Sequence, residues 1–276
     1  MEKVKDVVFR VLRYSPETGS PRWAEYKVPV VKGMTVLEGL FYIKENHDPT
    51  LVFRASCRMG VCGSCAMKVN GKHILACQTQ ILKLNSDVLN VEPLNNYRVI
   101  RDLVPDLTPL FQKHATVKPY IIRYSDPEEF NDPTGEYLQS PKELEEFLQF
   151  TYCIKCGACL SACPVVSGNE DFLGPQALTQ AYRYAVDTRD EGYIVDREVV
   201  SDIVSGVFRC HFVGACSEAC PKGVDPGMAL QLLKKEIFLY TFGLKREKKK
   251  AGFHRIDFNA PPPPDAPKPP PRTVEG

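Results

Sequence analysis

The sequence predicts two domains of different class, an α+β domain at residues 1–104 and an all-α domain at residues 105–243. Strand-like runs separated by turn residues fill the first domain, whereas amphipathic helical runs dominate the second. The eleven cysteines fall into three groups, one in the first domain and two in the second. Residues 244–276 form a basic, proline-rich tail that is expected to be extended.

Two strands and a helix open the first domain. Residues 7–13 and 24–31 are rich in β-branched and aromatic residues, and a turn containing proline and glycine separates them. Thr35 and Glu38 have the spacing of a capping box, and apolar residues follow at helical intervals. This pattern predicts a helix that begins directly after Thr35.

A hairpin and a closing strand are predicted next. Residues 66–69 and 73–77 flank Asn70 and Gly71, a dipeptide typical of a two-residue hairpin turn. Residues 88–91 are predicted to form the closing strand, because they are rich in valine and leucine.

A cysteine loop lies between the helix and the hairpin, with the pattern Cys57-x4-Cys62-x2-Cys65-x11-Cys77. The C-x4-C-x2-C opening is that of the plant-type [2Fe–2S] loop, and Cys77 provides the remote fourth thiolate. Gly60 and Gly63 let the backbone wrap tightly and point N–H groups at sulfur. Together with the element order, the loop predicts a β-grasp ferredoxin domain that binds a [2Fe–2S] cluster.

Helix signals organise the second domain. Ser140 as N-cap, Pro141 at N1 and Glu143 at N3 predict a helix that leads into the next cysteines. Two further helices are predicted from Gly174-Pro175 onward and over residues 228–242. The segment before them, from Pro105 to Pro141, has scattered prolines and is predicted to be a connector with short helices.

Two copies of one cysteine template lie between these helices, Cys153-x2-Cys156-x2-Cys159-x3-Cys163-Pro164 and Cys210-x2-Val213-x2-Cys216-x3-Cys220-Pro221. In the bacterial ferredoxin pattern, three close cysteines bind one cubane cluster and the cysteine before proline binds the other cluster. The predicted [4Fe–4S] ligands are therefore Cys153, Cys156, Cys159 and Cys220. The remaining three, Cys163, Cys210 and Cys216, predict a [3Fe–4S] cluster, because Val213 cannot bind iron. The second domain is therefore expected to be an all-α, two-cluster ferredoxin domain.

Disulfides and structural zinc are the two other uses to which the cysteines are suited. A disulfide framework is disfavoured by the odd count and by the lack of an apolar secretory region at the start. Structural zinc is the stronger rival, because C-x2-C pairs also suit tetrahedral zinc. Zinc sites, however, do not usually follow a third cysteine with x3-Cys-Pro.

Composition and missing motifs limit the function further. The formal net charge of +1 gives no bias toward nucleic acid, and no apolar run is long enough to cross a bilayer. The chain has neither a dinucleotide-binding G-x-G-x-x-G after a strand nor a His-Asp-Ser constellation. A chain of clusters bound only by cysteine moves single electrons, so the chemistry at its ends is expected to belong to partners.

Four stretches resemble one family: RASCRMGVCGSCAMKVNG with Cys77, CIKCGACLSACP, FLGPQALTQAYRYAVDTRDEG and CHFVGACSEACPKGVDP. They are similar to the iron–sulfur subunit of succinate dehydrogenase and fumarate reductase, respiratory complex II, over about residues 5–243. All eleven cysteines fall on family ligand positions.

The resemblance implies a flavoprotein partner with covalent FAD and a membrane-anchor partner of the cytochrome b type. Electrons would pass from FAD through [2Fe–2S], [4Fe–4S] and [3Fe–4S] to a quinone at the anchor. The chain would lie peripherally on the cytoplasmic face of the plasma membrane. The basic residues 245–250 fit anionic lipid there, and they fit a solvated helix end at least as well.

Three other residues match family positions near the quinone pocket: Pro164, His211 and Lys234. His211 has the chemistry to exchange protons with a quinone, and it fits an ordinary surface histidine equally well. Lys234 would stabilise a quinol oxyanion, although a lysine on such a helix is more often solvated. Gly168 departs from the family, because many members have tryptophan there, and this segment is closer to the fumarate reductase branch.

The leading functional hypothesis is the electron-transfer subunit of succinate:quinone oxidoreductase. The alternative is quinol:fumarate reductase, which runs the reverse reaction. A free multi-cluster ferredoxin is disfavoured by the length and near-neutral charge of the chain. Iron–sulfur subunits of anaerobic glycerol-3-phosphate dehydrogenase or heterodisulfide reductase usually have two complete four-cysteine motifs, which Val213 argues against.

Overall fold

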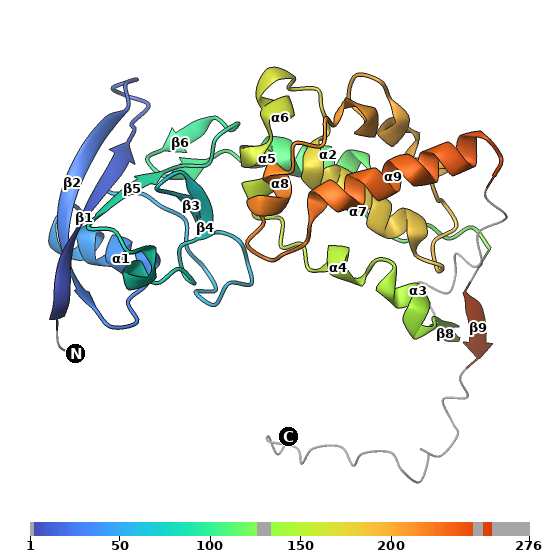
Figure 1. Cartoon of the computed structure of the whole chain (residues 1–276), viewed down its shortest axis with the longest axis horizontal. Coiled ribbons are helices and arrows are strands. Elements are labelled where there is room, and N and C mark those ends of the chain that lie inside the picture. Colours follow the sequence, from blue (N-terminus) through green and yellow to red (C-terminus); the bar gives the residue numbers. More distant parts are fainter. Residues whose placement is uncertain (1–2, 126–133, 245–250, 256–276) are drawn as a thin grey trace, which may run out of the picture.

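The computed structural model describes residues 3–125, 134–244 and 251–255. A sheet domain and a helical domain lie side by side along the long axis of the molecule (Figure 1). The basic run at residues 245–250 and both runs of consecutive prolines lie outside the described residues.

The first domain contains a five-stranded mixed sheet in the order β2-β1-β5-β3-β4. Its strands are β1 (Lys3–Arg13), β2 (Arg22–Val31), β3 (Ala66–Val69), β4 (Lys72–Leu75) and β5 (Val88–Glu92). β1 is antiparallel to β2 and parallel to β5, and β3 is antiparallel to both β4 and β5. The predicted strands are therefore confirmed, and so is the hairpin, because Asn70 and Gly71 both have positive φ.

Helix α1 (Val36–Asn46) lies against this sheet and begins with the predicted capping box between Thr35 and Glu38. Gly39 allows the close approach, since a Cβ there would lie 2.5 Å from the ring of Phe9. Val36, Leu40 and Ile43 are fully buried with the alternating inward residues of β1. The other short elements of this half are η1 (Ile81–Leu84), β6 (Val99–Arg101) and β7 (Val104–Pro105).

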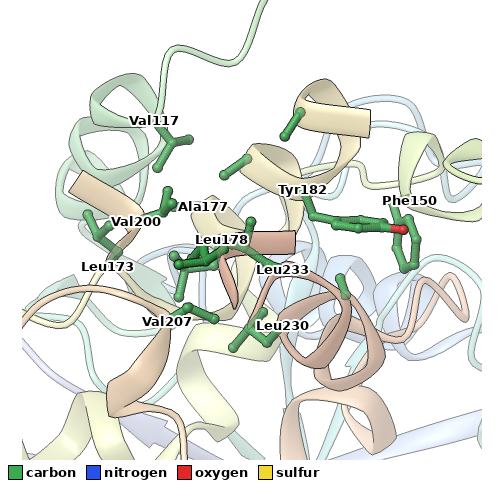
Figure 2. Close-up of a cluster of buried hydrophobic side chains, with 14 of the residues drawn as sticks. Val117, Phe150, Leu173, Ala177, Leu178, Tyr182, Val200, Val207, Leu230 and Leu233 are labelled. Atoms are coloured by element: carbon green, nitrogen blue, oxygen red, sulfur yellow. The ribbon is translucent and has the colours of Figure 1, made fainter. Parts of the chain in front are cut away.

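Three longer helices form the second domain: α2 (Thr108–Thr116), α7 (Gly174–Val186) and α9 (Pro226–Thr241). α7 packs against both other helices, and its residues Leu178 and Tyr182 meet Leu230 and Leu233 of α9 in one core (Figure 2). Short elements carry the loops between them: α3 (Pro141–Glu145), α4 (Leu148–Thr151), α5 (Ala158–Ala162), α6 (Pro164–Gly168), η3 (Val195–Ser201), η4 (Val207–Arg209) and α8 (Ala215–Glu218). The predicted helices at 174 and 228 are confirmed.

The helix predicted after Ser140 differs from the sequence-based expectation. The capping box at Ser140 and Glu143 is present, but α3 ends at Glu145 and does not run on to the cysteines. Phe147 has φ −129°, outside the helical region, and its ring is buried in the core, so the chain restarts as α4. The prediction of one continuous helix was therefore wrong.

The start of the C-terminal tail forms a strand that sequence patterns did not indicate. β9 (Gly252–Arg255) pairs antiparallel with β8 (Gly135–Leu138), far from it in sequence. The rings of Tyr137 and Phe253 contact each other in a tilted arrangement, with ring centroids 5.1 Å apart. No helix in the described part of the chain is long and apolar enough to span a membrane.

Candidate metal centres

In the cysteine loop of the first domain, backbone N–H groups donate hydrogen bonds to the sulfurs of Cys57, Cys62 and Cys65. The N–H groups of Val61 and Cys62 donate to Cys57 Sγ at 3.3 and 3.2 Å. Further along, the N–H of Cys77 donates to Cys65 Sγ at 3.5 Å. The positive φ of Gly60, 73°, lets the backbone turn so tightly. The loop therefore presents N–H groups to sulfur, which is how proteins tune iron–sulfur clusters.

In the second domain, the first hollow is lined by the four cysteines Cys153, Cys156, Cys159 and Cys220, with apolar Ile154 and Val224 beside them. Cys220 belongs to the second cysteine template, yet it lies with the first three cysteines of the first template. The position of Cys220 is the one that the crossover predicted from the sequence requires.

The second hollow is lined by Cys163, Cys210 and Cys216 and by Val213, Pro164 and His211. Cys163 has crossed in the opposite direction, from the first template to the second. Val213 contributes a hydrocarbon side chain where the first hollow has Cys156. The fold therefore separates seven cysteines into a set of four and a set of three.

The two loops have the same backbone path. The second residue after the opening cysteine has positive φ in both, 53° at Lys155 and 56° at Phe212. The fourth residue does so too, with 86° at Gly157 and 82° at Gly214. α5 and α8 then begin at the next residue in each loop. This repetition places Val213 at the backbone position that corresponds to Cys156.

Burial makes the more deeply buried of these thiols poor acids, whereas hydrogen bonds from Ser64 and Cys57 lower the pKa of the exposed Cys62 to about 6. Loss of solvation raises the pKa of Cys65 to about 12 and that of Cys156 to about 11, and nearby thiols add to the effect. The fully buried Cys159 has a pKa well above the ordinary value for the same reasons. Among the described residues, no three His, Cys, Asp or Glu side chains are arranged around one metal-ion position. Grouped buried thiols around a hollow fit an iron–sulfur cluster, whose irons hold the sulfurs as thiolates.

The three quinone-pocket candidates do not share one position. Pro164 and His211 are exposed and line the second hollow. The Lys234 side chain instead donates a 2.9 Å hydrogen bond from Nζ to the carbonyl oxygen of Cys210. Lys234 therefore holds α9 to the loop of the second hollow and is not simply solvated. At Gly168 a Cβ would meet nothing within 4 Å, so a larger side chain has room there.

Contacts between the two domains include residues that the sequence did not single out. Asn96 donates from Nδ2 to the carbonyl oxygens of Leu160 at 2.9 Å and Cys163 at 3.0 Å. The Tyr97 hydroxyl donates to the carbonyl oxygen of Gly157 at 3.1 Å. These bonds fasten the first domain to the loop that carries the first three cysteines of the first hollow. No spacing signal identifies them, because their partners lie at least sixty residues away in sequence.

Gly63 brings the [2Fe–2S]-type loop against the first hollow. Its φ is +73°, and a Cβ at Gly63 would lie 2.8 Å from Cβ and 3.0 Å from Cα of Cys156. Cβ atoms do not tolerate such distances, so only glycine fits without displacing one of the loops.

We expect Gly63→Ala to push the two loops apart and to weaken magnetic coupling between the clusters, as measured by EPR spin relaxation. The same change should cost about 1–3 kcal/mol of stability, from overpacking and backbone strain. Gly33→Ala is the matched control, because φ is +86° there and nothing lies within 4 Å of the added Cβ. Equal coupling in both variants would show that Gly63 does not set the separation.

Comparison with known proteins identifies two domains and a set of full-length relatives. A 2Fe-2S iron–sulfur cluster binding domain matches residues 8–112, and a 4Fe-4S dicluster domain matches residues 149–224. The fumarate reductase iron–sulfur subunit of Mycobacterium tuberculosis is 46% identical over 229 residues, 83% of this chain and 91% of that protein. The succinate dehydrogenase iron–sulfur subunit of Paracoccus denitrificans is 40% identical over 229 residues, covering 82% and 86%.

A solved structure has the same fold. The match is to the Mycobacterium smegmatis Sdh1 complex in its apo form, with a TM-score of 0.74 and 25% sequence identity. The match covers 86% of this chain and 97% of the matched chain. The predicted fold class, a [2Fe–2S] ferredoxin domain followed by a two-cluster ferredoxin domain, is confirmed by these findings.

Proposed function

The chain belongs to the family of succinate dehydrogenase and fumarate reductase iron–sulfur subunits, and from this premise we propose that it conducts electrons between a flavoprotein and a membrane quinone. The observation that supports this most is the separation of seven cysteines into a four-thiol hollow and a three-thiol hollow. When bound, the clusters supply one-electron transfer, which links a two-electron flavin to a quinone.

The proposed ligand sets follow the grouping of the thiols. The [2Fe–2S] cluster is assigned to Cys57, Cys62, Cys65 and Cys77. The [4Fe–4S] cluster is assigned to Cys153, Cys156, Cys159 and Cys220. The [3Fe–4S] cluster is assigned to Cys163, Cys210 and Cys216. Backbone N–H groups that face sulfur support all three assignments, and the apolar lining of the two hollows supports the second and the third.

The arrangement of the loops supports an order for the three clusters. Gly63 of the first loop touches Cys156 of the first hollow. Cys163 and Cys220 exchange between the two hollows, so the second hollow adjoins the first. We therefore place the [4Fe–4S] cluster between the other two, with the flavoprotein at the first domain. The domain limits at residues 104 and 243 are part of this proposal, and the two separate cores support them.

The membrane side is assigned to the second hollow. Phe212 and Val213 line this hollow, although their side chains are 58% and 63% exposed. Exposed apolar residues beside a redox site favour a partner surface over open solvent. We propose that the membrane-anchor subunit covers them, with the quinone near Pro164 and His211 and the chain on the cytoplasmic face.

Two directions of reaction remain for the intact complex. Succinate oxidation by quinone is our first proposal. Quinol-driven fumarate reduction has specific support as a second candidate, because fumarate reductase subunits of M. tuberculosis and Escherichia coli O157:H7 are 46% and 42% identical to the chain. Gly168 in place of tryptophan points the same way.

Both activities should be measured on the purified complex, with menaquinone and ubiquinone analogues. If the chain belongs to a succinate:quinone oxidoreductase, as we propose first, succinate oxidation should be faster than fumarate reduction with at least one of the quinone analogues. An assay of the same complex without any quinone analogue is the control, because it measures the background activity that does not depend on quinone. Faster fumarate reduction with every analogue would assign the chain to quinol:fumarate reductase.

A further inference from the structure

Gln176 is a buried polar side chain on the wall of the first hollow. It lies near the start of α7, and only 2% of its surface is exposed. Its Nε2 is 4.0 Å from Cys153 Sγ, within reach of a long hydrogen bond to sulfur. Thr179 lines the same hollow, but its hydroxyl donates to the carbonyl oxygen of Pro175 in its own helix. Of these two α7 side chains, Gln176 is therefore the one whose donor faces the sulfur of Cys153.

The side-chain amide has one favourable orientation. Gln176 Nε2 lies 3.2 Å from His114 Nδ1 as well as near Cys153. Burial, with a contribution from Lys155, lowers the pKa of His114 to about 4, so the ring is neutral near pH 7. In the tautomer that has its proton on Nε2, Nδ1 is the acceptor that faces the amide. An iron-bound cysteine is a thiolate, which only accepts. The two amide hydrogens therefore serve His114 and Cys153, and turning the amide over would set its oxygen against both acceptors.

This orientation leaves the amide oxygen buried without a hydrogen-bond partner. Such an oxygen is unfavourable, and a leucine at this position would avoid the cost. The neighbouring residues of α7, Ala177 and Leu178, are apolar and buried as an ordinary core helix requires. For packing alone, an apolar residue would therefore be more favourable than glutamine at position 176. What glutamine adds at this position is its two side-chain N–H donors.

We propose that Gln176 tunes the [4Fe–4S] cluster by donating a hydrogen bond to the Cys153 thiolate, and that His114 is the positioning residue that fixes the amide. The inference rests on the ligand set of the proposed function. A hydrogen bond to a ligand sulfur withdraws negative charge and stabilises the reduced cluster, so it raises the reduction potential.

The test is a redox titration of the purified complex, in which the EPR signal of the reduced [4Fe–4S] cluster is measured at each potential. Gln176→Leu preserves the approximate size of the side chain and removes the donor. We expect a more negative midpoint potential for the [4Fe–4S] cluster and unchanged potentials for the other two. His114→Leu should shift it in the same direction by less, since the amide would keep its place but lose its orientation. Thr179→Val is the matched control and should shift nothing.

The proposal fails if Gln176→Leu assembles the [4Fe–4S] cluster with an unshifted potential, or if Thr179→Val shifts it equally. Should Gln176→Leu lose the cluster, Gln176→Met gives the same reading, because its flexible side chain fills the space without a donor. Absence of the [4Fe–4S] signal from the unaltered complex would instead refute the ligand set itself. That outcome is distinguishable from an unshifted potential.

Discussion

Replacing Val213 with cysteine is expected to convert the three-iron cluster into a four-iron cluster. The oxidised complex should lose the EPR signal of the [3Fe–4S] centre, because an oxidised [4Fe–4S] cluster is diamagnetic. Iron content should rise from about nine to about ten atoms per chain, as the cluster types predict. Quinone-linked activity should fall, because a fourth thiolate adds negative charge and makes the cluster harder to reduce.

The physical reason is the shared backbone of the two loops. Phe212 and Gly214 reproduce the left-handed conformations of Lys155 and Gly157 on either side of the position in question. Val213 also lines the second hollow, as Cys156 lines the first. A thiol at position 213 would therefore extend from the same place on the same backbone path, with no rearrangement of the loop.

Val213→Ala is the control for this change, because it alters the side chain without adding a ligand. That variant should keep the three-iron signal and the original iron content. If Val213→Cys also kept an unchanged three-iron signal at full iron content, residue 213 would not point at the vacant corner. The correspondence between the two loops would then hold for the backbone alone.

Local signals explain what could be predicted from the sequence. The capping boxes at Thr35 and Ser140 and the Asn70-Gly71 turn involve neighbours within a few residues, so their chemistry is legible in the chain itself. The cysteine spacings carry equally local information, since each triplet must wrap one cluster. The exchange of Cys163 and Cys220 between the two sites could be predicted only because the bacterial ferredoxin template includes it.

Long-range contacts explain what could not be predicted. Asn96 looks ordinary in the sequence, and Gly63 is recognisable there only as a glycine of the cysteine loop. The contacts of both residues across the domain boundary appear only in the fold. The pairing of β8 with β9 joins segments more than one hundred residues apart. Phe147 ended a helix that propensity would have continued, because burial of its ring outweighed helical geometry. Tertiary packing decided each of these cases.

Removing Cys220 is expected to abolish the [4Fe–4S] cluster while the [3Fe–4S] cluster persists. Cys220 belongs to the second template but lines the first hollow, so Cys220→Ala deletes one of four thiolates there. The three thiols of the second hollow stay untouched. EPR should therefore lose the reduced [4Fe–4S] signal and retain the three-iron signal of the oxidised complex. Electron transfer from succinate to quinone should fall by at least about a hundredfold, because the middle cluster of the proposed series is lost.

Cys163→Ala is the mirror variant and distinguishes crossed from sequential ligation. Cys163 follows the first triplet in sequence, yet it lines the second hollow with Cys210 and Cys216. Crossed ligation predicts that Cys163→Ala removes the three-iron signal and spares the [4Fe–4S] cluster. Sequential ligation predicts the reverse for both variants, since Cys163 would then complete the first site and Cys220 the second. Because each variant removes one thiol before a proline, general destabilisation would affect both alike, and only ligand identity would make their spectra opposite.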